Sequence, residues 1–280
     1  MKKLLLPLAL IFFSFSLSAQ KAPDPYSPEV TKNFAFDLYQ TGFYDEAESE
    51  FRRYLFTTSD IDDNAVITLA SIYNEKNNLT GINWITLNIR PKLNFTAKEK
   101  VDIVQGRLLF RNGDRDNFAQ FADSIQNDLE NFSLDFKNLI PLSNLILFRN
   151  FEEAKELAKN AAEQNQIFID VSNSLNEYKE KSPGLALTLS MLLPGGGKFY
   201  TGSYSQGITS LLSVASFASA CAYSGIESEW KSWKPYVYGG CGLVLWIVDI
   251  YGSYQSAKRY NAALYRDLCT TTEQVYEEIF

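Results

Sequence analysis

The feature that most constrains this chain is an abrupt loss of charge about two thirds of the way along it. Residues 182–226 form a stretch of 45 residues in which Lys198 is the only charged side chain. After a short polar loop, residues 235–255 carry one charge, that of Asp249. Such stretches are costly to expose to water, and about 20 helical residues suffice to cross a bilayer. The sequence therefore predicts a two-helix transmembrane hairpin in its last third.

The residues before this stretch have the composition of a water-soluble domain. Residues 20–181 contain 18 Lys and Arg and 26 Asp and Glu. Pro183 follows at once, and proline commonly marks a break between helices. We therefore divide the chain in four. The parts are a signal peptide at 1–19, a helical-repeat domain at 20–181, a membrane hairpin at 182–262 and a C-terminal tail at 263–280.

The first 19 residues have the order of a bacterial secretory signal peptide. Two lysines precede an uncharged, Leu- and Phe-rich run at 4–17, and the small residues Ser18 and Ala19 follow. Cleavage after Ala19 would export the rest of the chain. We therefore expect a bacterial cell-envelope protein whose repeat domain lies on the periplasmic side of a membrane. The alternative is an N-terminal membrane helix that is not cleaved, although its apolar run is short for a span.

The charged domain shows helical periodicity with a regular spacing of turns. Residues at positions 42, 77, 113 and 149 fall where one helix of a hairpin should end and the next begin, 35 or 36 residues apart. The pattern Ala35, Leu38, Gly42, Ala47 and Phe51 is similar to a tetratricopeptide repeat, whose period is 34 residues. The repeat-turn landmarks over 28–162 are Gly42, Ala47, Gly113 and Ala154.

These patterns predict an all-α protein, an α-solenoid of about four helical hairpins followed by the transmembrane hairpin. A further amphipathic stretch at 167–178 predicts a capping helix. An irregular helical bundle would bury the same residues and is the alternative. Stacked hairpins form a concave face, so the expected partners are other proteins or peptides.

The uncharged region carries a glycine-rich turn and a later Trp-x-x-Asp pair. The turn motif consists of Pro194, Gly195, Gly197, Phe199, Tyr200 and Gly202, with Gly207 after it; the pair is Trp246 and Asp249. Together these motifs resemble the small two-transmembrane domain family and bacterial envelope proteins with a Pro-Gly-x-Gly-x-x-Tyr-x-Gly membrane domain. The chain differs at Lys198, where that family often has a His-Arg pair. The resemblance implies a membrane location, with lipid contacts through 184–255, and implies no reaction.

Asp249 is the one ionisable residue inside the second predicted span. A carboxylate in a membrane usually faces protein, water or the interface. We expect it to accept a hydrogen bond from the turn around 198–200 and so to lock the hairpin. The alternative is a role in moving protons or ions.

Several classes of function are excluded by composition. The chain has no histidine, which excludes Ser-His-Asp and Cys-His catalysis and His-ligated zinc. Its net charge of −7 argues against a general nucleic-acid binder. Cys221, Cys241 and Cys269 form no Cys-x-x-Cys motif, and the first two could be buried thiols or a disulfide. We therefore expect no catalytic residue, metal or cofactor.

The sequence favours a membrane-anchored envelope scaffold, or adaptor, that binds proteins through its repeats and is not an enzyme. Two alternatives stay open. One is an accessory factor for membrane-protein insertion or envelope assembly. The other is an ion- or solute-handling membrane module that uses Asp249.

Overall fold

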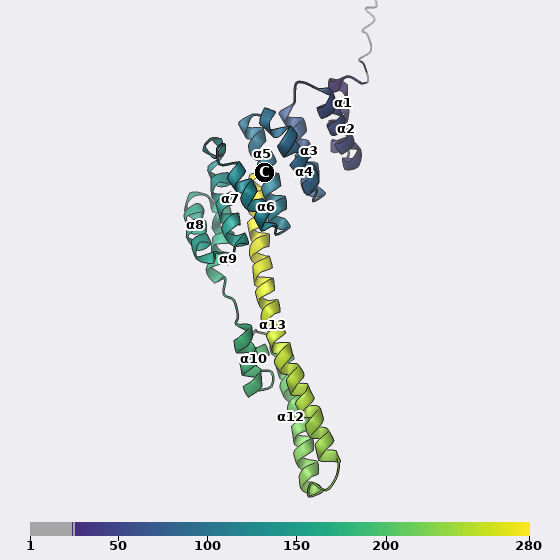
Figure 1. Ribbon diagram of the computed structural model, residues 1–280, viewed down its shortest axis with the longest axis vertical. Helices are drawn as coiled ribbons and strands as arrows, with labels where there is room; N and C mark the ends of the chain where they lie inside the picture. The colour runs from purple at the N-terminus through teal and green to yellow at the C-terminus, as the bar shows by residue number, and fades with distance from the viewer. Residues whose placement is uncertain (1–23, 25) are drawn as a thin grey trace, which may run out of the picture. The chain divides into compact units, whose positions relative to one another are not determined.

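A computed structural model describes residue 24 and residues 26–280, so the expected signal peptide lies outside the described residues (Figure 1). Within that part every regular element is a helix, which confirms the all-α prediction. The chain forms two compact units that divide between Lys76 and Asn77. The boundary expected at 181/182 does not coincide with this division.

The first unit is a helical hairpin followed by one more helix: α1 (Pro28–Gln40), α2 (Tyr44–Thr57) and α3 (Asp63–Glu75). Ser27 caps α1 by accepting a hydrogen bond from the backbone N–H of Val30. Ala35 and the landmark Ala47 are fully buried, so α1 and α2 approach closely, and Phe51 fills the space beside them. This is the burial that the sequence pattern predicted.

The second unit holds the remaining helices. These are α4 (Leu79–Asn88), α5 (Phe95–Arg111), α6 (Arg115–Ser124), α7 (Leu134–Leu147), α8 (Phe151–Gln164), α9 (Ile169–Glu177), α10 (Pro183–Leu192), α11 (Gly196–Tyr200), α12 (Tyr204–Glu227) and α13 (Lys234–Ile279), with short 3₁₀ turns at Arg90–Lys92, Leu129–Asn131 and Gln166–Phe168. Consecutive helices pack in pairs, α5 on α6 and α7 on α8. The landmark Ala154 is fully buried on α8, and α9 lies where the capping helix was expected.

Each of the four predicted turn positions adopts a left-handed backbone conformation. The φ angles are +85° at Gly42, +50° at Asn77, +65° at Gly113 and +60° at Arg149. After Gly42 and Gly113 the next N–H donates to a carbonyl five residues back, from Phe43 to Leu38 and from Asp114 to Leu109. This hydrogen bond is typical of a helix that ends in a left-handed residue. The spacing of 35 or 36 residues therefore marks equivalent turns.

The C-terminal tail expected at 263–280 belongs to α13, which runs unbroken from Lys234 to Ile279 (Figure 1). The border expected at 262/263 falls inside this helix. The last part of α13 packs against α5, α7 and α9. Its apolar side chains Leu268, Val275 and Tyr276 are buried in the main hydrophobic core of the second unit. The helix therefore joins the uncharged region directly to that core.

Tyr276 is the largest side chain of this contact and is fully buried. Its hydroxyl donates a 2.9 Å hydrogen bond to Ser143 Oγ on α7, and burial raises the pKa of the phenol well above its usual range. Around it, Arg107 on α5 pairs with Glu273 and Glu277. An apolar anchor surrounded by ion pairs thus fixes the end of α13.

We predict that Tyr276→Ala lowers the free energy of unfolding of the full chain by about 3–5 kcal/mol, because it leaves a large cavity in the core. Tyr276→Phe removes only the hydrogen bond and should cost about 1 kcal/mol. Chemical unfolding in an uncharged detergent, followed by far-ultraviolet circular dichroism, measures both. The exposed Glu278→Ala on the same helix is the control. A Tyr276→Ala variant as stable as this control would show that the tail is not part of the core.

Candidate functional site

The glycine-rich turn after α10 reverses the chain at a point where no side chain fits. Gly195 has φ +84°, a conformation that side chains disfavour, and a Cβ there would lie 2.3 Å from the carbonyl oxygen of Gly207. Pro194 precedes it and α11 follows it. Gly195 and Gly207 are thus glycines because the start of α12 touches the turn.

Three further close approaches involve the predicted motif residues Gly197 and Gly207. A Cβ on Gly197 would lie 2.0 Å from the carbonyl oxygen of Ala186 on α10 and 2.7 Å from Cβ of Ser253 on α13. A Cβ on Gly207 would lie 2.7 Å from the ring of Phe199. Helices α10, α11, α12 and α13 therefore meet at backbone distance around the turn.

Asp249 lies at the centre of this packing and is only 3% exposed. Its Oδ2 accepts a 2.6 Å hydrogen bond from the backbone N–H of Gly195, and its Oδ1 lies 2.8 Å from Lys198 Nζ. Lys198 also donates to Ser210 Oγ on α12, at 2.6 Å. The predicted bond between Asp249 and the turn is thus present, with Gly195 and Lys198 as its partners. The carboxylate and the ammonium compensate each other inside an otherwise apolar hairpin.

A second set of hydrogen bonds continues along the same face of α13. Ser190 Oγ accepts from the backbone N–H of Gly197 at 2.9 Å and donates to Ser253 Oγ at 2.7 Å. The indole N–H of Trp246 donates to the carbonyl of Ser190 at 2.7 Å. Neither serine was predicted from the sequence. Ser253 follows Asp249 by four residues, which places these two side chains on one face of α13, whereas Ser190 on α10 has no comparable signal.

The last motif residues join the turn to the chain that enters it. Gly202 has φ +78° and ends α11, and the Tyr200 hydroxyl accepts a 3.2 Å hydrogen bond from the N–H of Ser182. Nearby, Asn261 on α13 donates to the carbonyl of Lys181 at 2.9 Å and accepts from its N–H at 2.8 Å. These hydrogen bonds tie the chain before α10 to α11 and α13, while the bonds around Asp249 and Ser190 form the polar cluster of the turn.

The outside of these helices is apolar and exposed. Figure 1 shows α12 and the first half of α13 side by side, with α10 beside α13 and with α4–α9 at the other end of α13. The exposed large side chains include Ile208, Leu212, Tyr223, Ile226, Leu243, Val244, Ile247 and Val248. Within the described residues α12 is the one helix long and apolar enough to cross a membrane. The second span expected on α13 is not supported in the same way, because glycines, tyrosines and Asp249 dilute its apolar residues.

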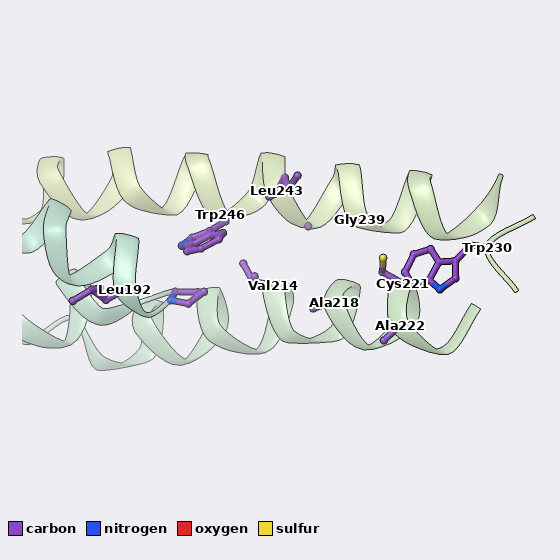
Figure 2. A pocket seen from close by; sticks show the side chains of 11 residues that line it. Leu192, Val214, Ala218, Cys221, Ala222, Trp230, Gly239, Leu243 and Trp246 are labelled. Atoms are coloured by element: carbon purple, nitrogen blue, oxygen red, sulfur yellow. The ribbon is translucent and has the colours of Figure 1, made fainter. Parts of the chain in front are cut away.

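A groove of ≈ 480 Å³ runs between α12 and α13 (Figure 2). It is lined almost entirely by apolar or small side chains: Leu192, Pro194, Val214, Ala218, Cys221, Ala222, Trp230, Gly239, Gly242, Leu243 and Trp246. Trp230 and Trp246 lie toward its opposite ends. The groove therefore presents an apolar surface with few groups that could form hydrogen bonds to a ligand.

The described residues bring together no cluster of three or more Asp, Glu, Cys or His side chains that could hold a metal. The three cysteines are free thiols, with Cys241 exposed. Cys221 faces Gly239, where an added Cβ would lie 3.2 Å from its sulfur. The disulfide alternative therefore does not hold. What the polar cluster can do is fix the geometry of four helices.

Comparison with known proteins gives one relative. An uncharacterized protein of Methanocaldococcus jannaschii is 36% identical over 90 residues, which are 32% of this chain and 64% of the relative. The chain thus matches slightly less than two thirds of that protein's length. No model of a known protein family matches the chain, and no solved structure matches it.

We predict opposite effects for two glycine substitutions in this region. Gly197→Ala forces a methyl group into the carbonyl of Ala186 and should destabilise the hairpin by about 3 kcal/mol. Gly240→Ala on α13 meets open space and should stabilise its helix by about 0.5–1 kcal/mol. Thermal unfolding of the full chain in an uncharged detergent measures both. Equal melting temperatures for the two variants would contradict the close packing.

We also predict that Asp249→Asn costs about 3 kcal/mol of stability, because it leaves the Lys198 charge buried without its partner. The double variant Lys198→Met/Asp249→Asn should recover part of that loss, since it removes both charges. The same unfolding measurement applies. A stable Asp249→Asn protein that has lost transport across vesicles would instead favour the ion-handling alternative.

Proposed function

We propose that this protein is a membrane-anchored scaffold, in which α12 and the first half of α13 cross a bilayer and the other helices bind proteins. The main support for the membrane anchor is the exposed apolar surface of α12 and α13, which has aromatic residues at both of its ends. Trp230, Trp233 and Tyr236 are exposed at the loop end of the hairpin. Tyr204 and Tyr251 are exposed at the other. Aromatic side chains of this kind favour the membrane–water interface.

The length of the hairpin supports this anchor. Residues 235–254 of α13 extend about 30 Å at 1.5 Å per residue, which matches the hydrocarbon thickness of a bilayer. The polar side of this segment does not face outward. Asp249 is paired with Lys198, and Ser253 is fully buried against α10. A bilayer would therefore meet mainly apolar side chains on α13, despite its lower overall hydropathy.

The helical pairs support the protein-binding part of the proposal. Their equivalent left-handed turns and buried small residues fit tetratricopeptide-like hairpins stacked as an α-solenoid, a fold that usually binds peptides. The surface made by α5, α7 and α9 is filled by α13, so we place the binding face on the first unit. There Phe34 and Leu38 line a groove of ≈ 380 Å³ beside Asp45 and Glu46. Its chemistry suits a segment with basic and apolar residues.

The signal-like first 19 residues place this scaffold in a bacterial cell envelope in our proposal, with the helical units exported to the periplasmic side. Protease treatment of intact cells and of spheroplasts tests the orientation. The helical units should be cleaved in spheroplasts and protected in intact cells. Protection in both would place them in the cytoplasm.

A second candidate, an accessory factor for membrane-protein insertion, is favoured by the apolar groove between α12 and α13. Small residues such as Ala218 and Gly239 line it, and small residues allow close packing of another helix in a membrane. Crosslinking from Cys221, which lines the groove, to newly made membrane proteins would separate this candidate from a passive anchor.

We predict that Leu212→Lys on α12 and Ile247→Lys on α13 each impair membrane insertion, since a lysine near the centre of a span costs about 3 kcal/mol. Both side chains are more than half exposed, so neither change would disturb a protein surrounded by water. Leu87→Lys on α4, where the leucine is 79% exposed, is the control. The measurement is the fraction of full chain that stays with membranes after an alkaline wash.

Full membrane retention of both hairpin variants, or a full chain that is soluble without detergent, would refute the anchor. Loss for Leu212→Lys alone would leave α12 as the one span.

A further inference from the structure

Positive side chains surround α13 just beyond the apolar surface, on the side nearest α5–α9. Lys258 and Arg259 are exposed and consecutive, so they point about 100° apart around the helix. Lys181 lies on a third side, where Asn261 holds its backbone by two hydrogen bonds. These three residues, Lys181, Lys258 and Arg259, are called the basic collar below.

The three residues of the basic collar have no carboxylate partner in the part of the chain that the structure describes, since none of them takes part in an ion pair there. Lys181 Nζ lies instead 4.8 Å from the centre of the Tyr200 ring and 5.7 Å from that of Tyr260. The neighbouring Glu180 pairs with Arg149 at 3.1 Å. Lys258 Nζ likewise lies 4.7 Å from the centre of the Tyr254 ring. Two of the three cations thus lie beside tyrosine rings, and Lys258 and Arg259 are exposed.

The height of the collar matches the headgroup layer of a membrane, if the hairpin spans one as proposed above. Lys258 follows Lys234 by 24 residues of continuous helix, about 36 Å along its axis. The hydrocarbon core is about 30 Å thick, and the headgroup regions bring the bilayer to about 40–45 Å. The collar therefore falls just outside the hydrocarbon, where lipid phosphates lie.

The loop end of the hairpin lacks this excess of positive charge. Its two basic residues, Lys231 and Lys234, are accompanied by Glu227 and Glu229. Lys231 and Glu229 form an ion pair at 2.5 Å. The hairpin is thus charged asymmetrically, with a net positive end toward α5–α9 and a balanced end at the loop.

We propose that the basic collar binds the phosphate groups of anionic phospholipids in the leaflet beside α5–α9. Ammonium and guanidinium groups donate charge-assisted hydrogen bonds to phosphate oxygens, and each basic residue near an anionic surface adds to the attraction. The adjoining tyrosine rings lie at the same level and suit the interface. This inference rests on the proposed membrane anchor and gives that anchor a lipid preference.

The test uses the full chain in an uncharged detergent, titrated with phosphatidylglycerol or phosphatidylcholine, with bound lipid counted by native mass spectrometry. We expect clear preference for phosphatidylglycerol, weaker at high salt. Lys258→Gln/Arg259→Gln should reduce the affinity for phosphatidylglycerol by about five-fold per charge, or about 25-fold together. The matched control Lys231→Gln/Lys234→Gln removes the same charge at the loop end and should keep the preference.

Three results would overturn the proposal that the basic collar binds anionic phospholipids. They are equal binding of the two lipids, an equal loss of preference in both double variants, and displacement of phosphatidylglycerol by inorganic phosphate at the same concentration. The last would indicate a site for free phosphate. A chain that needs no detergent would refute the anchor itself, a different failure from a membrane protein without lipid preference.

Discussion

The buried pair of Lys198 and Asp249 is the interaction on which the hairpin depends. An acid in an apolar helix is costly unless its charge is compensated and its oxygens are hydrogen-bonded. Here a lysine and a backbone N–H supply both, and they reach the carboxylate because Gly195 and Gly197 let α11 sit directly against its neighbours. The ion pair therefore depends on the close approach that these glycines allow. Without the close approach the lysine would miss its partner.

The same face of α13 then determines how the rest of the second unit is held. Asp249 and Ser253 fix its first half to α10 and α11, and Tyr276 fixes its end in the core of α5, α7 and α9. No proline or glycine interrupts the helix after Gly252. One continuous helix therefore contacts α10 and α11 through its first half and the core of α5, α7 and α9 through its end.

Much of this could be predicted from sequence, because the relevant signals are local. The turns at 42, 77, 113 and 149 follow from short-range periodicity, and the partnership of Asp249 with the turn follows from one charge in an apolar segment. The role of 263–280 was not predictable in this way. Its contacts, such as that of Tyr276 with Ser143, join residues more than 130 positions apart. The local sequence of a charged amphipathic helix does not indicate which other helices it packs against. The glycine clashes that explain Gly195 and Gly197 likewise depend on tertiary packing.

The position of α13 also limits where the proposed scaffold could bind a peptide. A groove that its own C-terminal helix fills with Tyr276 and surrounds with ion pairs is not open to a peptide, since an incoming helix would have to replace a fully buried aromatic residue. Among the described contacts, no other helix occupies the groove of the first unit. Phe34 is exposed there beside acidic residues. In the proposed scaffold, the second unit would therefore supply the membrane anchor and the first unit the binding face.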